Sequence, residues 1–217
     1  MTWSVLVPVK PLEGAKTRLV GPDGPDGSNG PDAAARAELA LAFACDTVMA
    51  AAACPRVGLV FAVTDDPRAH EALGALGARV VDGEPGGGLN PALAHGAARA
   101  RAERPDEGVC ALSADLPALR PDELDRVLAD AGLHARSFAA DAQGVGTTLY
   151  AAAPGAAFLP AFEGRSRMRH RSLGTVELLR TDVPGLRRDV DTRVDLALAR
   201  ALGVGPHTSK ALGRLGL

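Results

Sequence analysis

A short apolar run near the start of the chain, residues 5–9 (VLVPV), constrains the fold most. Such a run is typical of a strand that is buried on both faces, as in the middle of a parallel sheet. Pro8 and Pro11 cannot donate backbone hydrogen bonds to a neighbouring strand, so we expect the strand to end there. A loop that leaves the carboxyl end of a central strand opens into the crevice where open α/β sheets bind ligands.

The loop after this strand is short and basic. It holds Lys10, Lys16 and Arg18, and two of the three lysines of the whole chain lie in it. Its cations suit phosphate groups, and Gly14 allows close approach of the backbone to a ligand. We therefore expect a triphosphate-binding loop. A solvated basic turn explains the same residues equally well, because the pattern is neither G-x-x-x-x-G-K-[ST] nor G-x-G-x-x-G.

The composition indicates one globular domain, residues 1–217, with 47% apolar residues to form a core. A net charge of −2 without a long basic run argues against a nucleic-acid partner. We find no signal-peptide pattern and no apolar stretch that could span a membrane, and we expect a cytoplasmic protein. The three scattered cysteines lack metal-ligand spacing and fit buried thiols in a reducing compartment.

Strands and helices alternate along the chain, which predicts an α/β fold with an open, mostly parallel sheet flanked by helices. After the first strand we expect strands at residues 57–63, 79–81, 109–112, 137–140, 147–152 and 176–179. We expect helices at residues 33–53, 70–76, 91–104, 194–202 and from residue 121 onward. The turn-rich residues 20–32 predict a mobile loop that serves as a spacer or as a lid, and residues 203–217 predict a loose tail.

Asp32 is predicted as a helix cap, and Asn90 is predicted to cap a helix with Pro91 at its first position. Asp65 and Asp66 precede Pro67, which favours a helix cap here too, and the alternative is that they reach the crevice. The glycines at 86–88 let a backbone lie flat against a planar group. Free N–H groups beside Asn90 suit a ribose or a base edge, so we expect nucleotide contacts here. A merely flexible loop is the alternative.

Three carboxylates are candidates for a metal site. Asp115 follows the strand 109–112 among apolar residues, where an unpaired charge is costly and Mg²⁺ is the natural partner in a phosphate crevice. Asp189 and Asp191 face the same side of an extended segment, so they repel each other unless a cation lies between them. Together the three predict a two-metal cluster. The alternative for Asp191 is a helix cap.

A second group of polar residues follows later in the chain. Thr147 and Thr148 begin a strand after a glycine-rich turn and offer hydroxyl and N–H donors. Gly164 and Ser166 open a helix whose N-terminus suits an anion. Arginines occupy every second position from 165 to 171, so one or two of them are expected to serve a ligand. We interpret His170 as a helix-end charge, and the alternative is a residue that supports the ligand contacts from behind.

The motifs VKPLEGAKTRL, SADLP, GVGTTL, FEGRS and DVDT follow one another at residues 9–19, 113–117, 144–149, 162–166 and 189–192. In this order and spacing they resemble the guanylyltransferases of coenzyme F420 biosynthesis. That family has a nucleotidyltransferase fold of the molybdopterin-guanylyltransferase type. The composition resembles the bacterial form, which uses phosphoenolpyruvate, whereas the archaeal form uses 2-phospho-L-lactate.

The resemblance implies GTP and phosphoenolpyruvate as substrates and a product that passes to the next enzyme of the F420 pathway. It implies Mg²⁺ held by Asp115, Asp189 and Asp191, with Lys16 and Asp115 as catalytic residues. The implied phosphoenolpyruvate contacts are Thr148, Glu163, Gly164 and Ser166. The expected nucleotide contacts are Lys10, Gly14, Lys16, Arg18, Gly88, Asn90 and Ser113. A homodimer is a further expectation.

One position departs from the family pattern, which often reads Phe-Gly-x-x-Ser. Here Glu163 follows Phe162, and glycine comes one residue later. A ligand contact through the backbone N–H would survive this change.

The alternative functions are a nucleotidyltransferase for 2-phospho-L-lactate, molybdopterin or a sugar phosphate, and a non-catalytic nucleotide-binding module.

Overall fold

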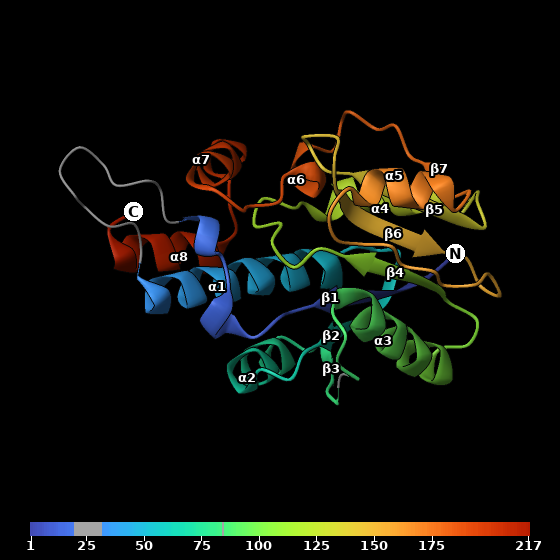
Figure 1. Ribbon diagram of the computed structural model, residues 1–217, viewed down its shortest axis with the longest axis horizontal. Helices are drawn as coiled ribbons and strands as arrows, with labels where there is room; N and C mark the ends of the chain where they lie inside the picture. The colour runs from blue at the N-terminus through green and yellow to red at the C-terminus, as the bar shows by residue number, and fades with distance from the viewer. Residues whose placement is uncertain (20–31, 84) are drawn as a thin grey trace.

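The computed structural model describes residues 1–19, 32–83 and 85–217 (Figure 1). Its centre is a seven-stranded sheet in the order β3-β2-β1-β4-β6-β5-β7. The strands are β1 (Trp3–Pro8), β2 (Val57–Val63), β3 (Arg79–Val81), β4 (Gly108–Leu112), β5 (Arg136–Ala140), β6 (Thr147–Ala152) and β7 (Val176–Glu177). β6 runs antiparallel to β4 and β5, and the other strand pairs are parallel. The predicted open, mostly parallel sheet is confirmed.

Helices and short 3₁₀ turns connect these strands. They are η1 (Leu12–Gly14), η2 (Thr17–Leu19), α1 (Ala33–Ala52), α2 (Pro67–Ala75), α3 (Leu89–Glu103), α4 (Pro121–Ala131), α5 (Ser166–Ser172), α6 (Pro184–Arg187), α7 (Arg193–Leu202) and α8 (Pro206–Leu215). None of the helices in the described parts of the chain is long and apolar enough to cross a membrane. The expected mobile loop at residues 20–32 lies, apart from Asp32, outside the described residues.

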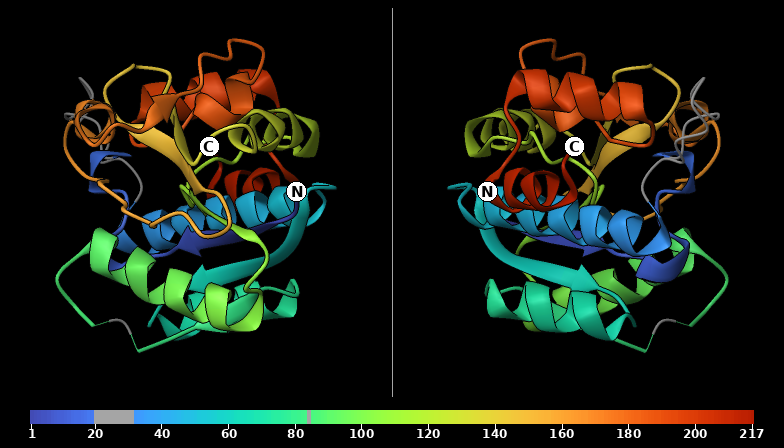
Figure 2. Two further views of the ribbon diagram at one scale, coloured as in Figure 1. Left: turned by 90° about the vertical axis from the view of Figure 1, so that its right-hand side faces the viewer. Right: turned by 90° about the vertical axis from the view of Figure 1, so that its left-hand side faces the viewer.

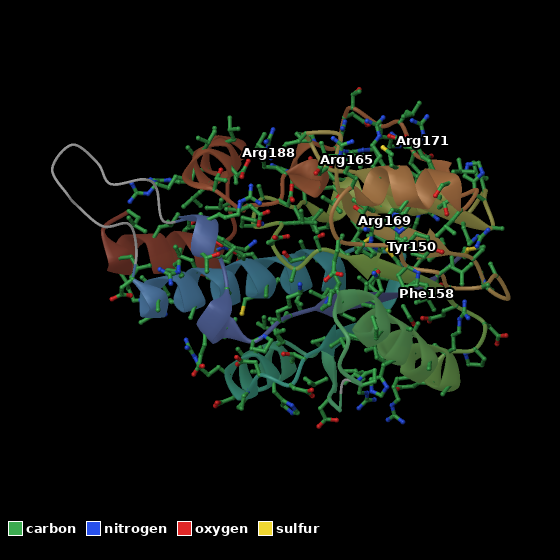
Figure 3. The ribbon with its side chains drawn as sticks, in the orientation of Figure 1. Tyr150, Phe158, Arg165, Arg169, Arg171 and Arg188 are labelled. Atoms are coloured by element: carbon green, nitrogen blue, oxygen red, sulfur yellow. The ribbon has the colours of Figure 1, made fainter. Side chains whose placement is uncertain are left out.

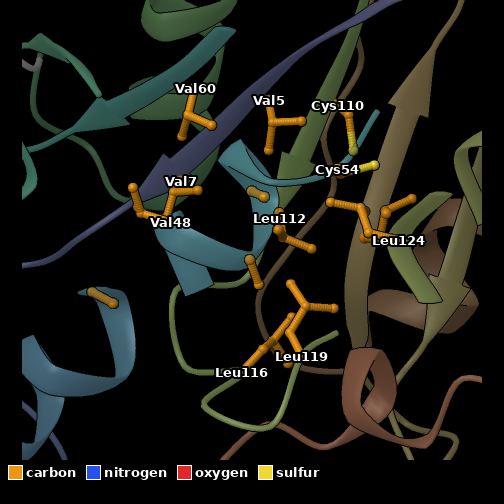
Figure 4. Close-up of a cluster of buried hydrophobic side chains, with 14 of the residues drawn as sticks. Val5, Val7, Val48, Cys54, Val60, Cys110, Leu112, Leu116, Leu119 and Leu124 are labelled. Atoms are coloured by element: carbon orange, nitrogen blue, oxygen red, sulfur yellow. The ribbon is translucent and has the colours of Figure 1, made fainter. Parts of the chain in front are cut away.

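The alternation of side chains along β1 builds a core on each face of the sheet. Val5 and Val7 point into a cluster that α1, α2 and α4 cover (Figure 4), which includes Leu124 of α4. Leu6, between them, belongs to the opposite cluster with Leu93 of α3. The predicted strand at residues 5–9 is therefore buried on both faces, and its carboxyl end is fixed at the edge where the site forms.

The expected loose tail at residues 203–217 is wrong, because residues 206–215 form α8. This helix lies alongside α1 (Figure 2) and buries Ala211 and Leu212. Its first N–H groups, those of His207 and Thr208, donate to the buried carboxylate of Asp46 at 3.0 and 2.8 Å. The cap that starts α8 thus comes from α1, where local sequence gives no sign of it.

Several helix starts agree with the predictions. Asp32 accepts a hydrogen bond from Ala35 N and caps α1, and Asp66 caps α2 with Pro67 at its first position. Two details are corrected. α3 begins at Leu89 with Gly88 as its cap, so Asn90 lies in its first turn and does not cap it. The last strand holds only Val176–Glu177 and stops short of residue 179.

Candidate active site

The carboxyl ends of β1 and β4 border a cleft of about 600 Å³. The loop at residues 8–18 forms one wall, and residues 111–115 form another. Leu89 and Leu93 of α3 and the Phe162 side chain complete the apolar part. The structure brings seven of the predicted site residues to this cleft: Lys10, Gly14, Lys16, Arg18, Ser113, Asp115 and Asp191.

Lys16 is the central cation of the cleft. Its ammonium group pairs with the Asp115 carboxylate and lies 3.0 Å from Asp191 Oδ1, and only 12% of its side chain is exposed. Burial disfavours the charge, but the attraction of Asp115 and Asp191 outweighs this effect and raises the pKa of Lys16. The residue has φ 54°, a left-handed conformation that costs a non-glycine residue energy. The fold therefore holds this charge at one place.

Asp189 is a partly buried carboxylate beside the same pair. Burial, and then the negative charges of Asp115, Asp141 and Asp191, raise the pKa of Asp189 to about 7. The backbone fixes this arrangement, because Val190 N donates to Asp115 O at 3.0 Å. Carboxylates from three chain segments are thus gathered at one edge of the sheet.

Asp191 is not a helix cap, so that alternative is wrong. Thr192 caps α7 in a capping box with Asp195, in which each side chain bonds to the other residue's backbone. Asp191 instead accepts hydrogen bonds from Lys16 Nζ and from Arg18 Nη1 at 3.0 and 3.3 Å. Its carboxylate therefore faces the cleft.

The carboxylates fit Mg²⁺ in their chemistry. Within the described residues, no group of three or more His, Cys, Asp or Glu side chains is placed to hold a metal ion, so Asp115, Asp189 and Asp191 do not form the predicted two-metal cluster in this structure. Mg²⁺, however, is usually held by one or two protein carboxylates together with substrate phosphates and water. Asp115 and Asp191 already meet on one cation, the Lys16 ammonium, and Asp189 lies beside them. Hard oxygen donors of this kind suit a magnesium ion that the substrate helps to bind.

None of the four residues expected to bind phosphoenolpyruvate is among the described residues that line the cleft, and two of them are buried. Thr148 is completely buried on β6, and its Oγ1 has no hydrogen-bond partner among the described residues. Ser166 begins α5 and is 3% exposed. Ser113 N donates to Thr148 O at 2.8 Å, which places Thr148 beside the cleft wall.

Glu163 and Gly164 form an exposed turn in which both residues have positive φ, at 80° and 57°. Glu163 therefore occupies a conformation that favours glycine. Its carboxylate lies 3.5 Å from Lys10 Nζ, which joins the turn to the basic loop. The Glu163 side chain is thus neutralised, and its backbone is what the turn offers to an anion.

Gly88 and Asn90 were expected to contact a nucleotide, but neither is among the described residues that line the cleft. Leu89, which lies between them, does line it. Gly88 has φ 101° and lies close to the Glu163 carboxylate. The Asn90 amide is used within the protein: Nδ2 donates to Phe162 O at 3.1 Å, and Oδ1 accepts from Phe162 N at 2.8 Å.

The interpretation of His170 as a helix-end charge is wrong. The ring is fully buried, stacks on Tyr150 with 4.9 Å between centroids, and accepts a hydrogen bond from Ala161 N. Burial lowers the pKa of His170 to about 4, so the ring is neutral.

The arginines near His170 have different partners. Arg167 and Arg171 pair with Glu177, and Figure 3 shows Arg165, Arg169 and Arg171 around α5.

One contact appeared only as an alternative in the sequence analysis, and a second was missed. Asp66 caps α2, but its second oxygen also accepts from Leu12 N at 2.9 Å and so holds the basic loop. Asp141 accepts from Val145 N and Gly146 N at 2.9 and 2.7 Å and shapes the turn before Thr148. Both aspartates lie in turn sequences, where a local role explains them, and only the fold reveals the second contact.

A basic loop and clustered carboxylates at the crevice of an open α/β sheet define a nucleotidyltransferase-like site. The model of the MobA-like NTP transferase domain matches residues 41–178. The chain belongs to this family and is a nucleotidyltransferase.

Two curated relatives are similar over almost their whole length. The phosphoenolpyruvate guanylyltransferase of Thermomonospora curvata is 57% identical, over 99% of this chain and 90% of the relative. That of Streptomyces coelicolor is 56% identical, over 99% and 98%. Among solved structures, a nucleotidyl transferase from Methanothermobacter matches with a TM-score of 0.55 and 20% identity over 93% of this chain and 97% of the other. At that identity the structural match supports the fold alone.

Proposed function

We propose that this chain joins GTP and phosphoenolpyruvate to give enolpyruvyl-diphospho-5′-guanosine and pyrophosphate, with Mg²⁺ as its metal. The observation that carries the proposal is the buried Lys16 between Asp115 and Asp191, in a chain that is 57% identical to a phosphoenolpyruvate guanylyltransferase. The reaction joins two polyanions, and this cleft offers both cations and metal-binding carboxylates for them.

The chemistry requires no general base. A phosphate oxygen of phosphoenolpyruvate, already an anion near neutral pH, attacks the α-phosphorus of GTP. A new P–O–P bond forms, the bond from the α-phosphorus to its bridging oxygen breaks, and pyrophosphate leaves with that electron pair. This agrees with the structure, in which His170 is buried and neutral and is used to hold backbone.

The basic loop supplies the contacts to the triphosphate. Lys16 is held in place by its backbone and by two carboxylates, so it can stabilise the charge that develops on the leaving pyrophosphate. Lys10 and Arg18 are exposed on the same loop and add positive charge. A Cβ added at Gly14 would meet open space, which leaves room for a phosphate against the backbone.

Asp115, Asp189 and Asp191 are the residues that would hold Mg²⁺. The metal, when bound, would neutralise charge on both substrates and polarise the reacting phosphate. Burial and then the negative charges of Asp115, Asp141 and Asp191 raise the pKa of Asp189, and a divalent cation would relieve the repulsion between these carboxylates.

The acceptor binds, in this proposal, against Thr148, Ser166 and the turn of Glu163 and Gly164. Thr148 Oγ1 is buried without a hydrogen-bond partner among the described residues, so the turn before β6 would have to shift on binding for this hydroxyl to reach the acceptor's carboxylate or phosphate. The Glu163 carboxylate is paired with Lys10, so the turn contributes backbone N–H groups. The substitution of glycine by glutamate at this position is compatible with such a contact.

The test is pyrophosphate release from GTP and Mg²⁺, with phosphoenolpyruvate, 2-phospho-L-lactate and a sugar phosphate supplied separately. We expect release with phosphoenolpyruvate and its loss in Asp115→Asn. Release with phospholactate alone would reassign the acceptor, and no release from folded protein with any acceptor would overturn the proposed function. Transfer of the product to the next F420 enzyme, the homodimer and the cytoplasmic location stay predictions.

A further inference from the structure

The segment at residues 159–163, here called the acceptor strap, leads into the turn at Glu163 and Gly164. Residues 159–163 belong to no helix or strand. Side chains from other elements hold their backbone instead. Tyr150 Oη accepts from Leu159 N at 3.0 Å, and His170 Nε2 accepts from Ala161 N at 3.0 Å.

The last attachment of the strap is a pair of hydrogen bonds with Asn90. The side-chain amide both donates to Phe162 O and accepts from Phe162 N, at 3.1 and 2.8 Å. The two opposed bonds fix the backbone of one residue, Phe162, through the peptide units on both of its sides, in the manner of a strand pair. The next residue is Glu163, whose left-handed backbone needs such support to persist.

Asn90 stands on α3, whose neighbouring residue Leu89 lines the cleft. The Asn90 side chain therefore connects α3, which borders the cleft, to the strap and so to the turn at Glu163 and Gly164, here called the acceptor turn. Asn90 is not among the described residues that line the cleft, and its amide spends one N–H and one oxygen lone pair on Phe162. This differs from the nucleotide contact that the sequence suggested.

His170 supports the same segment from the opposite side. Ala161 N is a donor, so Nε2 must accept, and the ring proton sits on Nδ1, facing Thr147 Oγ1 at 3.0 Å. Thr147 is the neighbour of Thr148, and His170 lies on the helix that Ser166 begins. The strap is thus tied to both remaining parts of the acceptor site.

We propose that Asn90 is the positioning residue of the acceptor turn: it sets the backbone of Phe162 and Glu163 for the acceptor and does not read the nucleotide. This inference rests on the proposed function for its kinetic consequence. The hydrogen bonds that carry it do not depend on the reaction.

The kinetic test compares Asn90→Ala and Asn90→Asp with the wild type and with Arg99→Ala, an exposed change on the same helix. Loss of two hydrogen bonds predicts an acceptor KM raised by about tenfold or more in Asn90→Ala, with the GTP KM changed by less than about twofold. Asn90→Asp keeps the acceptor for Phe162 N but sets a carboxylate against Phe162 O, so it should resemble the alanine variant. A raised GTP KM with an unchanged acceptor KM would overturn the proposal.

Hydrogen exchange supplies a readout that needs no activity. In Asn90→Ala the amides of Leu159, Ala161 and Phe162, which are the hydrogen-bonded amides of the strap, should exchange about tenfold or more faster, while those in the second half of α3 keep their wild-type rates. Unchanged exchange in the strap would refute the positioning role even in an active enzyme. A wild type without turnover would refute the proposed function, and the exchange result would still decide the role of Asn90.

Discussion

Asp189→Asn is expected to stabilise the fold while it removes activity. Burial and then the neighbouring carboxylates raise the pKa of Asp189 from 3.8 to about 7. This shift of the pKa means that the folded protein favours the protonated over the ionised Asp189 carboxyl by a free energy of roughly 4 kcal/mol, relative to the unfolded chain. Asparagine has the same shape and no charge, so the variant lacks the repulsion.

The sign of the pH dependence follows from the raised pKa. Between about pH 4 and 7 the folded protein holds a proton on Asp189 that the unfolded chain has lost, so the wild type loses stability as pH rises. The loss from this group is about 1.4 kcal/mol per pH unit in that window and stops above pH 7. The free energy of unfolding of Asp189→Asn should therefore exceed that of the wild type by a margin that grows by roughly 3 kcal/mol from pH 5 to pH 8.

The assay is urea unfolding at pH 5, 6, 7 and 8, without divalent cations, for the wild type, Asp189→Asn and the exposed control Asp106→Asn. The control should run parallel to the wild type. The same Asp189→Asn protein should have lost most of its turnover with GTP, acceptor and Mg²⁺. A margin between wild type and Asp189→Asn that stays constant with pH would refute the gathering of carboxylates around Asp189.

Three further changes test other parts of the structure. Lys16→Met should lower kcat/KM by about a hundredfold or more, because it removes the buried cation between Asp115 and Asp191; a loss below tenfold would contradict its role. Glu163→Gly should raise the free energy of unfolding by about 1 kcal/mol through relief of the left-handed strain, measured by urea unfolding, and a loss of stability would contradict this. Asp46→Ala should cost about 2 kcal/mol and speed hydrogen exchange in the first turn of α8, and unchanged exchange there would count against the cap.

Features with a local cause could be predicted from the sequence. The apolar residues 5–9 and 60–63 specify central strands because burial on both faces leaves no polar position. Asp66 with Pro67 starts α2 through contacts within one turn. The basic loop and the carboxylates meet at the cleft because the carboxyl ends of neighbouring parallel strands share one edge of the sheet.

Features with a distant cause could not be predicted in this way. The cap of α8 comes from Asp46, 161 residues away from His207 in the chain. Asn90 resembles a helix cap, but its partner Phe162 is 72 residues away. His170 stands in a row of arginines that indicates a surface, and only the packing of its ring against Tyr150 shows that it is buried.

The most direct test of the central claim is to identify the product by ³¹P NMR after incubation of the wild-type protein with GTP, phosphoenolpyruvate and Mg²⁺. The account predicts signals of a mixed diphosphate that joins guanosine to enolpyruvate, with an equal amount of pyrophosphate, and no such signals with Asp115→Asn. Hydrolysis of GTP without a mixed diphosphate, or unchanged substrates with folded protein, would contradict it.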